Sequence, residues 1–182
     1  MKADAFFNTV RDALHKDFLC QQQGSFLEHV EVHHDNSTSK FRLKCGAKMV
    51  AFSLDKKAKN PFPILNAGFN KRNDLTLICL TSDGKPLVFV IECKNSERPG
   101  DAQIQIEAGI AFCEYLFKIL LFTHGLKLVP RFFGVAVFRP RQPPKGQTRP
   151  TFVRQGNHNI LRAEWHVDVD LPVSELIRAV EN

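Results

Sequence analysis

Three residues near the middle of the chain, Asp74, Glu92 and Lys94, have types and a spacing that suit phosphodiester hydrolysis. Asp74 opens the apolar run 75–80, and Glu92 and Lys94 end a second apolar run that begins at Leu87. Carboxylates and an ammonium group at the ends of buried strands are costly to bury unless they are paired or bind a ligand. A divalent metal ion and a phosphate would be suitable ligands, because Mg²⁺ prefers carboxylate oxygens and substrate phosphates.

The two apolar runs predict a β-hairpin, and its register decides whether the three side chains meet. Residues two apart on a strand share a face, so Glu92 and Lys94 point the same way and Cys93 points away. A two-residue turn would place Asp74 opposite Cys93, on the wrong face. A three-residue loop with Gly84 in the left-handed conformation places Asp74 opposite Glu92, and residues opposite each other share a face. We favour this second register.

In that register Asp74 and Glu92 would supply carboxylate ligands to Mg²⁺ or Mn²⁺, and the backbone carbonyl of Cys93 is a third candidate ligand. The metal would acidify a bound water and neutralise charge on the phosphate oxygens. Lys94 would orient the water or stabilise the transition state as a cation. In the alternative, structural interpretation, Asp74 caps a strand, and Glu92 and Lys94 form an exposed ion pair where the strand leaves the sheet.

The sequence Asp74, seventeen intervening residues and then Glu92-Cys93-Lys94 resembles the PD-(D/E)xK nuclease superfamily, which has the restriction-endonuclease-like fold. The resemblance covers about residues 4–138. It implies an α/β fold whose αβββαβ core has a mixed central sheet flanked by helices. It also implies that the Asp and the Glu bind magnesium or manganese and that the Lys assists the attacking water. Asn73 stands where the family name has proline, a position that varies widely in the group.

The resemblance implies further site residues and a mode of assembly. Nucleases of this group often carry a glutamine on the helix after the motif, which Gln105 or its neighbour Gln103 matches. They often have an acidic residue before the motif, for which Glu28 and Glu31 are the candidates and Asp55 is a weaker one. A chain of this size is also expected to work as a homodimer or within a larger nucleoprotein assembly.

Basic residues concentrate in two segments that bracket the motif. The chain carries 25 Lys and Arg against 19 Asp and Glu, a net charge of +6. Segment 40–72 has nine basic residues and one acid, and segment 127–154 has seven basic residues and no acid. Such blocks favour a polyanionic ligand, although solvated loops are the alternative interpretation. The candidate nucleic-acid contacts are Lys56, Lys57, Lys59, Lys71, Arg72, Arg139, Arg141, Lys145, Arg149 and Arg154.

Together these features favour a metal-dependent nuclease that acts on DNA, with the basic segments contributing affinity more than sequence selectivity. RNA is a substrate that the sequence does not distinguish from DNA. The alternative is a non-catalytic nucleic-acid-binding or assembly module on the same fold. A third hypothesis is a small interaction subunit whose basic loops bind an acidic protein.

The hydrophobic pattern predicts a single domain over residues 1–182, with a core at about 4–138 and a C-terminal extension at 139–182. The expected helices are one that Asp4 caps and that continues to Phe18, one from Asp101 to Phe122 that stops at His124-Gly125, and one at 172–180. The expected strands are 26–33, a hairpin of 40–45 and 48–54, the motif hairpin, 132–138 and 160–171. Residues 55–73 and the basic, proline-rich segment 139–150 are expected loops.

Composition favours a cytoplasmic protein that does not contact membranes. The five cysteines form no CxxC pair and are interpreted as buried free thiols of a reducing compartment. The longest apolar-leaning stretch, 104–121, is interrupted by charged residues, and the N-terminus lacks the apolar segment of a signal peptide. Two groups of potential metal ligands, His33-His34 and His166-Asp168-Asp170, are interpreted as surface polar residues.

Overall fold

The computed structural model of the chain forms an α/β structure with two sheets and a few helices. It describes residues 2–32, 38–46, 48–56, 59–66, 69–94, 99–138, 151–155, 160–164 and 170–181. The α/β class and the mixed sheet expected from the sequence are both present.

The larger sheet has a mixed strand arrangement. It consists, in spatial order, of β4 (Val50–Phe52), β5 (Leu75–Leu80), β6 (Pro86–Lys94), β7 (Arg131–Phe138), β9 (Ile160–Glu164) and β8 (Thr151–Gln155). Neighbouring strands are antiparallel except for β6–β7 and β7–β9, which are parallel. Parallel neighbours need a crossover, and α2 (Pro99–His124) provides it between β6 and β7.

The smaller sheet contains β1 (Gln22–Gln23), β2 (Phe26–Val32), β3 (Thr38–Lys44) and β10 (Leu171–Pro172), in that order. The strand predicted at 26–33 is therefore confirmed as β2, which pairs antiparallel with β3. β10 pairs parallel with β3, so the C-terminal part of the chain contributes a strand here as well as β8 and β9 in the larger sheet.

The hairpin predicted from 40–45 and 48–54 is wrong, because its two halves lie in different sheets. In β3, Phe41 and Leu43 are buried while Arg42 and Lys44 are exposed, which is the alternation of a strand covered on one face. All of β4 is buried, as expected of a strand covered on both faces. β3 consequently pairs with β2, and β4 pairs with β5.

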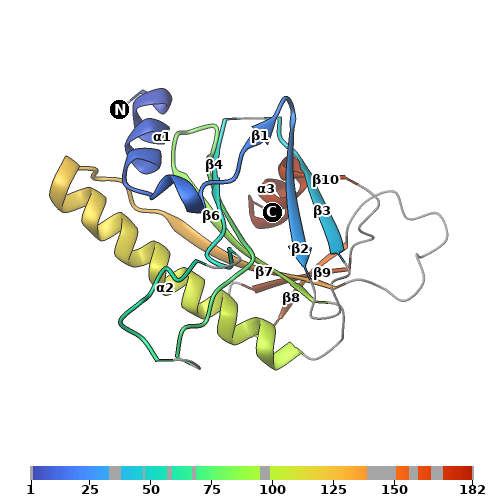
Figure 1. Cartoon of the computed structure of the whole chain (residues 1–182). Helices are drawn as coiled ribbons and strands as arrows, with labels where there is room; N and C mark the ends of the chain where they lie inside the picture. The colour runs from blue at the N-terminus through green and yellow to red at the C-terminus, as the bar shows by residue number, and fades with distance from the viewer. Residues whose placement is uncertain are drawn as a thin grey trace.

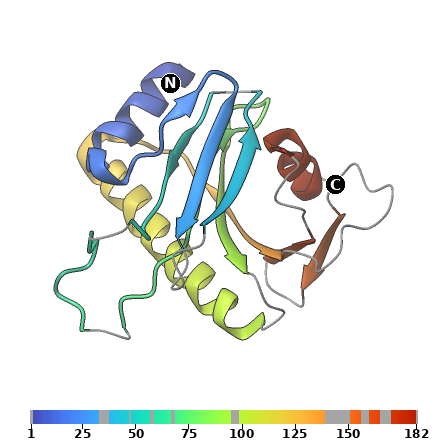
Figure 2. The same cartoon turned by 45° about the vertical axis from the view of Figure 1, so that its right-hand side comes forward.

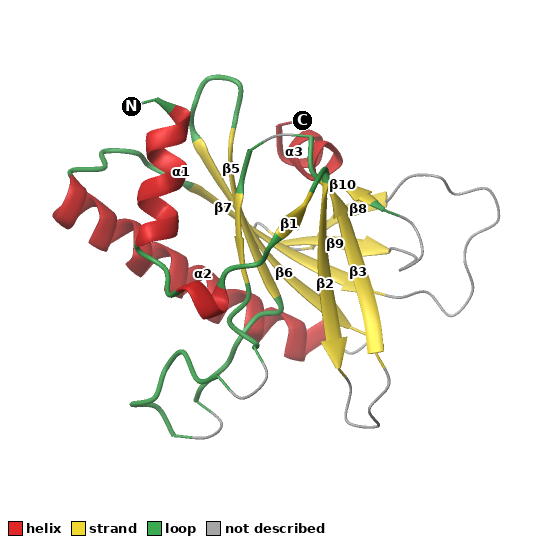
Figure 3. Cartoon of the chain, turned by 45° about the horizontal axis from the view of Figure 1, so that its top comes forward, coloured by secondary structure: helices red, strands yellow, loops and turns green. Residues whose placement is uncertain are grey.

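Two apolar clusters place the larger sheet between two layers. α1 (Ala3–Asp12) and α2 pack on one face, and the smaller sheet with α3 (Val173–Glu181) packs on the other. Figures 1 and 3 show α2 running along the sheet with α1 beside it, and α3 on the opposite side near β10. Successive residues of β5 and β6 alternate between the clusters, so these strands are apolar on both faces. Those on the helical face include Ile78, Val88 and Val90, and those on the other face include Leu77, Phe89 and Ile91.

The first helix is shorter than predicted, and Asp4 does not cap it. α1 ends at Asp12, its N-cap residue is Lys2, and the Asp4 carboxylate forms an ion pair with Lys48. A short 3₁₀ helix, η1 (Lys16–Phe18), follows. The chain then extends beside β4, where the Ser53 backbone N–H donates to the carbonyl of Phe18. Pairing with β4 thus overrides the helical spacing of the apolar residues.

The later elements follow the predictions more closely. α2 begins at Pro99 rather than at Asp101, and it ends at His124, directly before Gly125, whose φ of 63° is in the left-handed region. β7 and α3 are confirmed. The single strand predicted at 160–171 is wrong, because its ends form β9 and β10 in different sheets. β8 was not predicted, and the loop predicted at 139–150 lies outside the described residues.

All five cysteines are free thiols, as predicted, and Cys45, Cys79 and Cys113 are buried. Burial raises the pKa of the Cys79 thiol to about 12, so this group is chemically inert at neutral pH. Among the described residues, no helix is long and apolar enough to cross a membrane.

A glycine lets α2 approach the strands that carry the motif. A Cβ atom at Gly109 would lie 2.5 Å from Asn73 Oδ1 and 2.6 Å from Val90 Cγ1. Asn73 directly precedes Asp74, and Val90 is two residues before Glu92 on the same face of β6. α2 therefore packs directly against the residues that flank Asp74 and Glu92.

We expect Gly109→Ala to destabilise the fold, although alanine is normally the better residue in a helix interior by about 1 kcal/mol. Overpacking a close contact costs about 1–3 kcal/mol, so after the gain in helix propensity the net loss should be up to about 2 kcal/mol in urea unfolding. Gly46→Ala is the matched control, because nothing lies within 4 Å of a Cβ atom there and its φ is not in the left-handed region. Equal effects of the two substitutions would contradict the close packing of α2.

Candidate functional site

The β5–β6 hairpin has the register in which Asp74 lies opposite Glu92. Its pairs run from Leu75 opposite Ile91 to Leu80 opposite Pro86, so the next position outward from the first pair joins Asp74 and Glu92. Gly84 has a φ of 78°, and the Thr81 backbone N–H donates to the Lys85 carbonyl at 2.9 Å. These contacts enclose a three-residue loop at 82–84. The favoured register is thus confirmed.

Asp74 and Glu92 exchange hydrogen bonds across the open end of the hairpin. The Asp74 backbone N–H donates to Glu92 Oε2 at 3.2 Å, and the Cys93 backbone N–H donates to Asp74 Oδ2 at 2.7 Å. Each carboxylate therefore accepts a hydrogen bond from the backbone of the opposite strand. Hydrogen bonds to a carboxylate are stronger than those between neutral groups, and these two hold the side chains beside each other.

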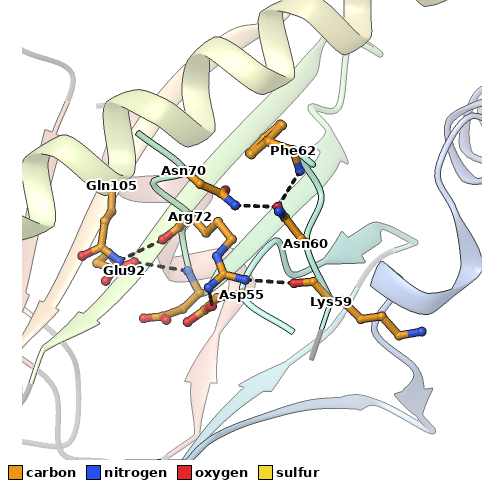
Figure 4. Close-up of polar contacts among 9 residues, drawn as sticks. Asp55, Lys59, Asn60, Phe62, Asn70, Arg72, Glu92 and Gln105 are labelled. Carbon is orange, nitrogen blue, oxygen red and sulfur yellow. Dashed lines mark hydrogen bonds and ion pairs between the residues drawn. The ribbon is translucent and has the colours of Figure 1, made fainter. Parts of the chain in front are cut away.

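Lys94 connects this carboxylate pair to α2. Its Nζ lies 2.6 Å from Glu92 Oε1 and donates to Gln105 Oε1, also at 2.6 Å. The side-chain amide of Gln105 then donates from Nε2 to the Arg72 carbonyl at 2.8 Å. Figure 4 shows Gln105 reaching from α2 toward the segment that carries Arg72, with Glu92 below it. One glutamine thus links helix, hairpin and the loop before Asp74.

The two carboxylates of the cluster are buried, and Lys94 is partly exposed. Asp74 is 4% exposed and Glu92 is 1% exposed, whereas the Lys94 side chain is 22% exposed. Burying a carboxylate is costly unless it is paired and hydrogen-bonded, which both carboxylates are. The alternative expectation of an exposed ion pair at the end of the strand does not describe this geometry.

A polar pocket of about 330 Å³ adjoins Lys94 and Gln105. Three cationic residues, Lys71, Arg72 and Lys94, line it, together with Asp55, Asn70, Ile104 and Gln105. The Arg72 guanidinium lies 3.1 Å from Asp55 Oδ1 and donates to the Lys59 carbonyl at 2.9 Å, as Figure 4 shows. The pocket combines a positive lining with a fixed guanidinium, which suits a phosphate group.

A larger pocket, of about 610 Å³, lies between α1 and the β1–β2 turn. Its one lining carboxylate, Asp4, forms an ion pair with Lys48 at 2.5 Å. Its two lining cations are already engaged, Arg11 by the Met49 carbonyl and Lys48 by Asp4, and neither Asp74 nor Glu92 lines it. The lining residues, rather than the cavity volumes, therefore favour the pocket beside Lys94 as the functional site.

Of the upstream acids, Asp55 is the one that lines the pocket beside the motif. Glu28 is exposed on β2 opposite Arg42, in the smaller sheet, and does not line that pocket. The side chain of Glu31 lies outside the described residues. The choice among these acids could not be made from the sequence because it depends on which strands pair.

The structure distinguishes the two candidate glutamines. Gln105 contacts Lys94, whereas Gln103 donates to Glu107 Oε1 at 2.8 Å on the exposed side of α2. Two residues apart on a helix correspond to a rotation of about 200°, so only one of them can face the sheet.

The predicted nucleic-acid contacts are described only in part. Lys71 and Arg72 line the pocket and Lys56 is half-buried. Lys59 lies 2.7 Å from Asp17, and its hydrogen bond holds the pKa of that carboxyl below its ordinary value. Of the rest, Lys57, Arg139, Arg141, Lys145 and Arg149 and the side chain of Arg154 lie outside the described residues.

Asn73 is a residue of this region that the sequence did not single out. It is fully buried, and its Nδ2 donates to Thr76 Oγ1 at 3.0 Å. Among the residues that the structure describes, its Oδ1 has no hydrogen-bond partner, and it faces the Cα of Gly109. A polar residue directly before a motif aspartate was the signal that could have marked it.

The donor chemistry is suitable for a hard divalent cation. Asp74 and Glu92 provide adjacent carboxylates, and the backbone carbonyl of Cys93 belongs to the same strand end. Within the described ranges, no group of three or more His, Cys, Asp or Glu side chains could hold a metal. A magnesium site commonly uses only one or two carboxylates together with water and phosphate.

No family model, curated protein or solved structure matches the chain. The assignment of the site consequently depends on its own geometry.

A double-mutant cycle should reveal strong coupling between Glu92 and Lys94. Lys94→Met leaves a buried carboxylate without its cation and should cost about 1–3 kcal/mol, less than for a fully buried pair because Lys94 is partly exposed. The double variant Glu92→Gln/Lys94→Met should recover at least about 1 kcal/mol of that loss in urea unfolding at pH 8.

The matched control is the exposed ion pair of Lys85 and Asp83, at 2.7 Å on the loop of the same hairpin. Asp83→Asn and Lys85→Met should show no measurable coupling, because exposed pairs are screened by water and salt. Coupling of equal size in the two cycles would contradict the burial of the motif pair.

Proposed function

We propose that the protein is a metal-dependent nuclease that hydrolyses phosphodiester bonds in DNA, with the restriction-endonuclease-like fold of the PD-(D/E)xK superfamily. The observation that carries the proposal is the register of the β5–β6 hairpin. It sets Asp74 opposite Glu92 and puts Lys94 on the same face, within 2.6 Å of Glu92. The three residues that resemble the motif thus form a cluster joined by hydrogen bonds and an ion pair, beside a cationic pocket.

The order of elements supports the fold assignment. η1 and the strands β1, β2 and β3 of the smaller sheet come between α1 and β4. With these set aside, the elements up to β7 have the order αβββαβ that the resemblance implies: α1, β4, β5, β6, α2 and β7. β4, β5 and β6 are consecutive antiparallel neighbours, and β7 lies parallel to β6 after the α2 crossover. The motif residues occupy the start of the second strand of this core and the end of the third.

In the proposed site, Asp74 and Glu92 would hold Mg²⁺ or Mn²⁺, with the Cys93 backbone carbonyl as a third ligand. The metal supplies Lewis acidity that activates a water and offsets charge on the phosphate. Lys94 has two functions in this arrangement: it neutralises Glu92 in the resting state and provides an ammonium group for the attacking water or the phosphate. Gln105 holds Lys94 in place by accepting a hydrogen bond from its ammonium group.

The pocket lined by Lys71, Arg72 and Lys94 would receive the phosphate backbone. Asp55 and the Lys59 carbonyl hold the Arg72 guanidinium in place, which lowers the entropy lost when a phosphate binds. These contacts are to the backbone of the nucleic acid, so they contribute affinity without sequence selectivity.

A second candidate function is a non-catalytic nucleic-acid-binding or assembly module. The observation that favours it is that each carboxylate already accepts a backbone hydrogen bond and Glu92 already has a cation beside it. Such a network stabilises a strand end without a metal. Calorimetric titration with Mn²⁺ separates the candidates: the nuclease binds Mn²⁺ and loses that binding in Glu92→Gln, whereas the module binds DNA but not Mn²⁺.

We expect purified protein to cut plasmid or oligonucleotide DNA when Mg²⁺ or Mn²⁺ is present. Glu92→Gln and Lys94→Met should each lower the cleavage rate by at least about 10²-fold, because each removes a charged group that acts on the reacting phosphate or water. The measurement is the initial rate of plasmid nicking with and without EDTA.

Lys85→Met is the control, because it removes a lysine from the same hairpin at the opposite end from the motif and should leave the rate unchanged. Each variant should first be shown to be folded by its urea unfolding transition. Metal-dependent cutting that persists in folded Glu92→Gln and Lys94→Met would assign the activity to some other site.

A further inference from the structure

The segment 59–72, between β4 and β5, is a loop whose two ends are tied together. Asn60 Oδ1 accepts hydrogen bonds from the Phe62 backbone N–H at 2.9 Å and from the Asn70 side-chain amide. Arg72 donates to the Lys59 carbonyl, as Figure 4 shows. The Phe62 ring packs edge-on against Phe112 of α2, with ring centroids 5.8 Å apart. The loop therefore has a defined base on the helical side of the sheet.

Three large apolar side chains of this loop are exposed to water. Ile64 is 93% exposed, Phe69 is 78% exposed and Leu65 is 43% exposed. Their backbones are held by local turns, since the Leu65 N–H donates to the Phe62 carbonyl and the Phe69 N–H donates to the Asn66 carbonyl. Figures 1 and 2 show the β4–β5 connection extending away from the sheet beside α2. We call Ile64, Leu65 and Phe69 the apolar tip.

The apolar tip continues directly into the cationic pocket. Phe69 is followed by Asn70, Lys71 and Arg72, all of which line the pocket beside Lys94. Adjacent Cα atoms are about 3.8 Å apart, so the Phe69 backbone lies next to Asn70, which lines that pocket. The exposed side chain of Phe69 is therefore attached close to the place where a phosphate would bind.

A nucleic acid has chemical groups that match both the cationic pocket and the apolar tip. Its backbone is anionic, and its bases offer flat apolar faces that stack on aromatic side chains. Exposed Phe, Leu and Ile side chains can also enter between base steps and unstack them. A base can meet the tip only where it is unpaired or readily unstacked, because the bases of a regular duplex are stacked on one another.

We propose that the apolar tip binds bases of the nucleic acid whose phosphates occupy the pocket, with Phe69 stacking on an unpaired base. This proposal rests on the proposed function and specifies its substrate class: DNA in which a duplex adjoins unpaired nucleotides is bound more tightly than a continuous duplex. Lys71 and Arg72 hold the backbone on one side of Phe69, and Ile64 and Leu65 cover the apolar face of the base.

The test is equilibrium binding by fluorescence anisotropy in EDTA, so that no cleavage occurs. The probes are a labelled short duplex and the same duplex with a central run of unpaired nucleotides. Wild-type protein should favour the second DNA, and Ile64→Ser/Leu65→Ser/Phe69→Ser should lose about tenfold in affinity for it, as expected for the loss of one stacked base. Affinity for the continuous duplex should change less than twofold.

The matched control is Phe122→Ser/Val129→Ser, which removes exposed apolar side chains, 79% and 85% exposed, outside the loop. It should bind both probes like the wild type. Equal affinity of the wild type for the two DNAs would overturn the proposal. An equal loss of affinity for the two DNAs in the triple serine variant would overturn it as well. Loop-dependent binding to anionic phospholipid vesicles without DNA selectivity, or loop-dependent self-association in sedimentation, would also overturn it in favour of a membrane or a second copy of the chain.

The outcome is separable from that of the proposed function. Loop-dependent selectivity in EDTA, together with no metal-dependent cutting by the wild type, would support the base contact and contradict the nuclease. Metal-dependent cutting that depends on Glu92, with no selectivity between the two probes, would support the nuclease and contradict the base contact.

Discussion

The open end of the β5–β6 hairpin is held by two hydrogen bonds in which each motif carboxylate accepts from the backbone of the opposite strand. The Asp74 N–H binds Glu92, and the Cys93 N–H binds Asp74. These bonds require the register in which Asp74 and Glu92 share a face, and that register requires the left-handed Gly84 at the other end of the hairpin. A shift of one residue would turn Asp74 into the opposite apolar layer, where no cation could balance it.

The rest of the site follows from this constraint. A buried carboxylate pair needs a cation, and Lys94 provides it because it lies two residues beyond Glu92 on the same face. Gln105 then holds Lys94 and the Arg72 carbonyl at once, which connects the hairpin to α2 and to the loop 59–72. The absence of a side chain at Gly109 allows α2 to come close enough for that connection. Backbone geometry, ion pairing and the cationic pocket are thus parts of one network.

Local patterns in the sequence predicted the hairpin, favoured its three-residue turn and predicted the end of α2 before Gly125, because each depends on neighbouring residues. Long-range pairing was harder to predict. The hairpin predicted from 40–45 and 48–54 combines residues of β3 and β4, which lie in different sheets. The roles of Asp55 and Gln105 depend on how β4 and α2 meet β5 and β6, which no local pattern specifies. Gln103 and Gln105 could be distinguished only once the helical face against the sheet was known.

The central claim is that Asp74 and Glu92 form a site for a divalent metal ion. The most direct measurement is anomalous diffraction from crystals of the protein soaked in Mn²⁺. The account predicts a strong anomalous peak within coordination distance, about 2.0–2.3 Å, of one oxygen from each carboxylate. Crystals whose other sites bind Mn²⁺, but in which this position shows no peak and Lys94 remains on Glu92, would contradict it.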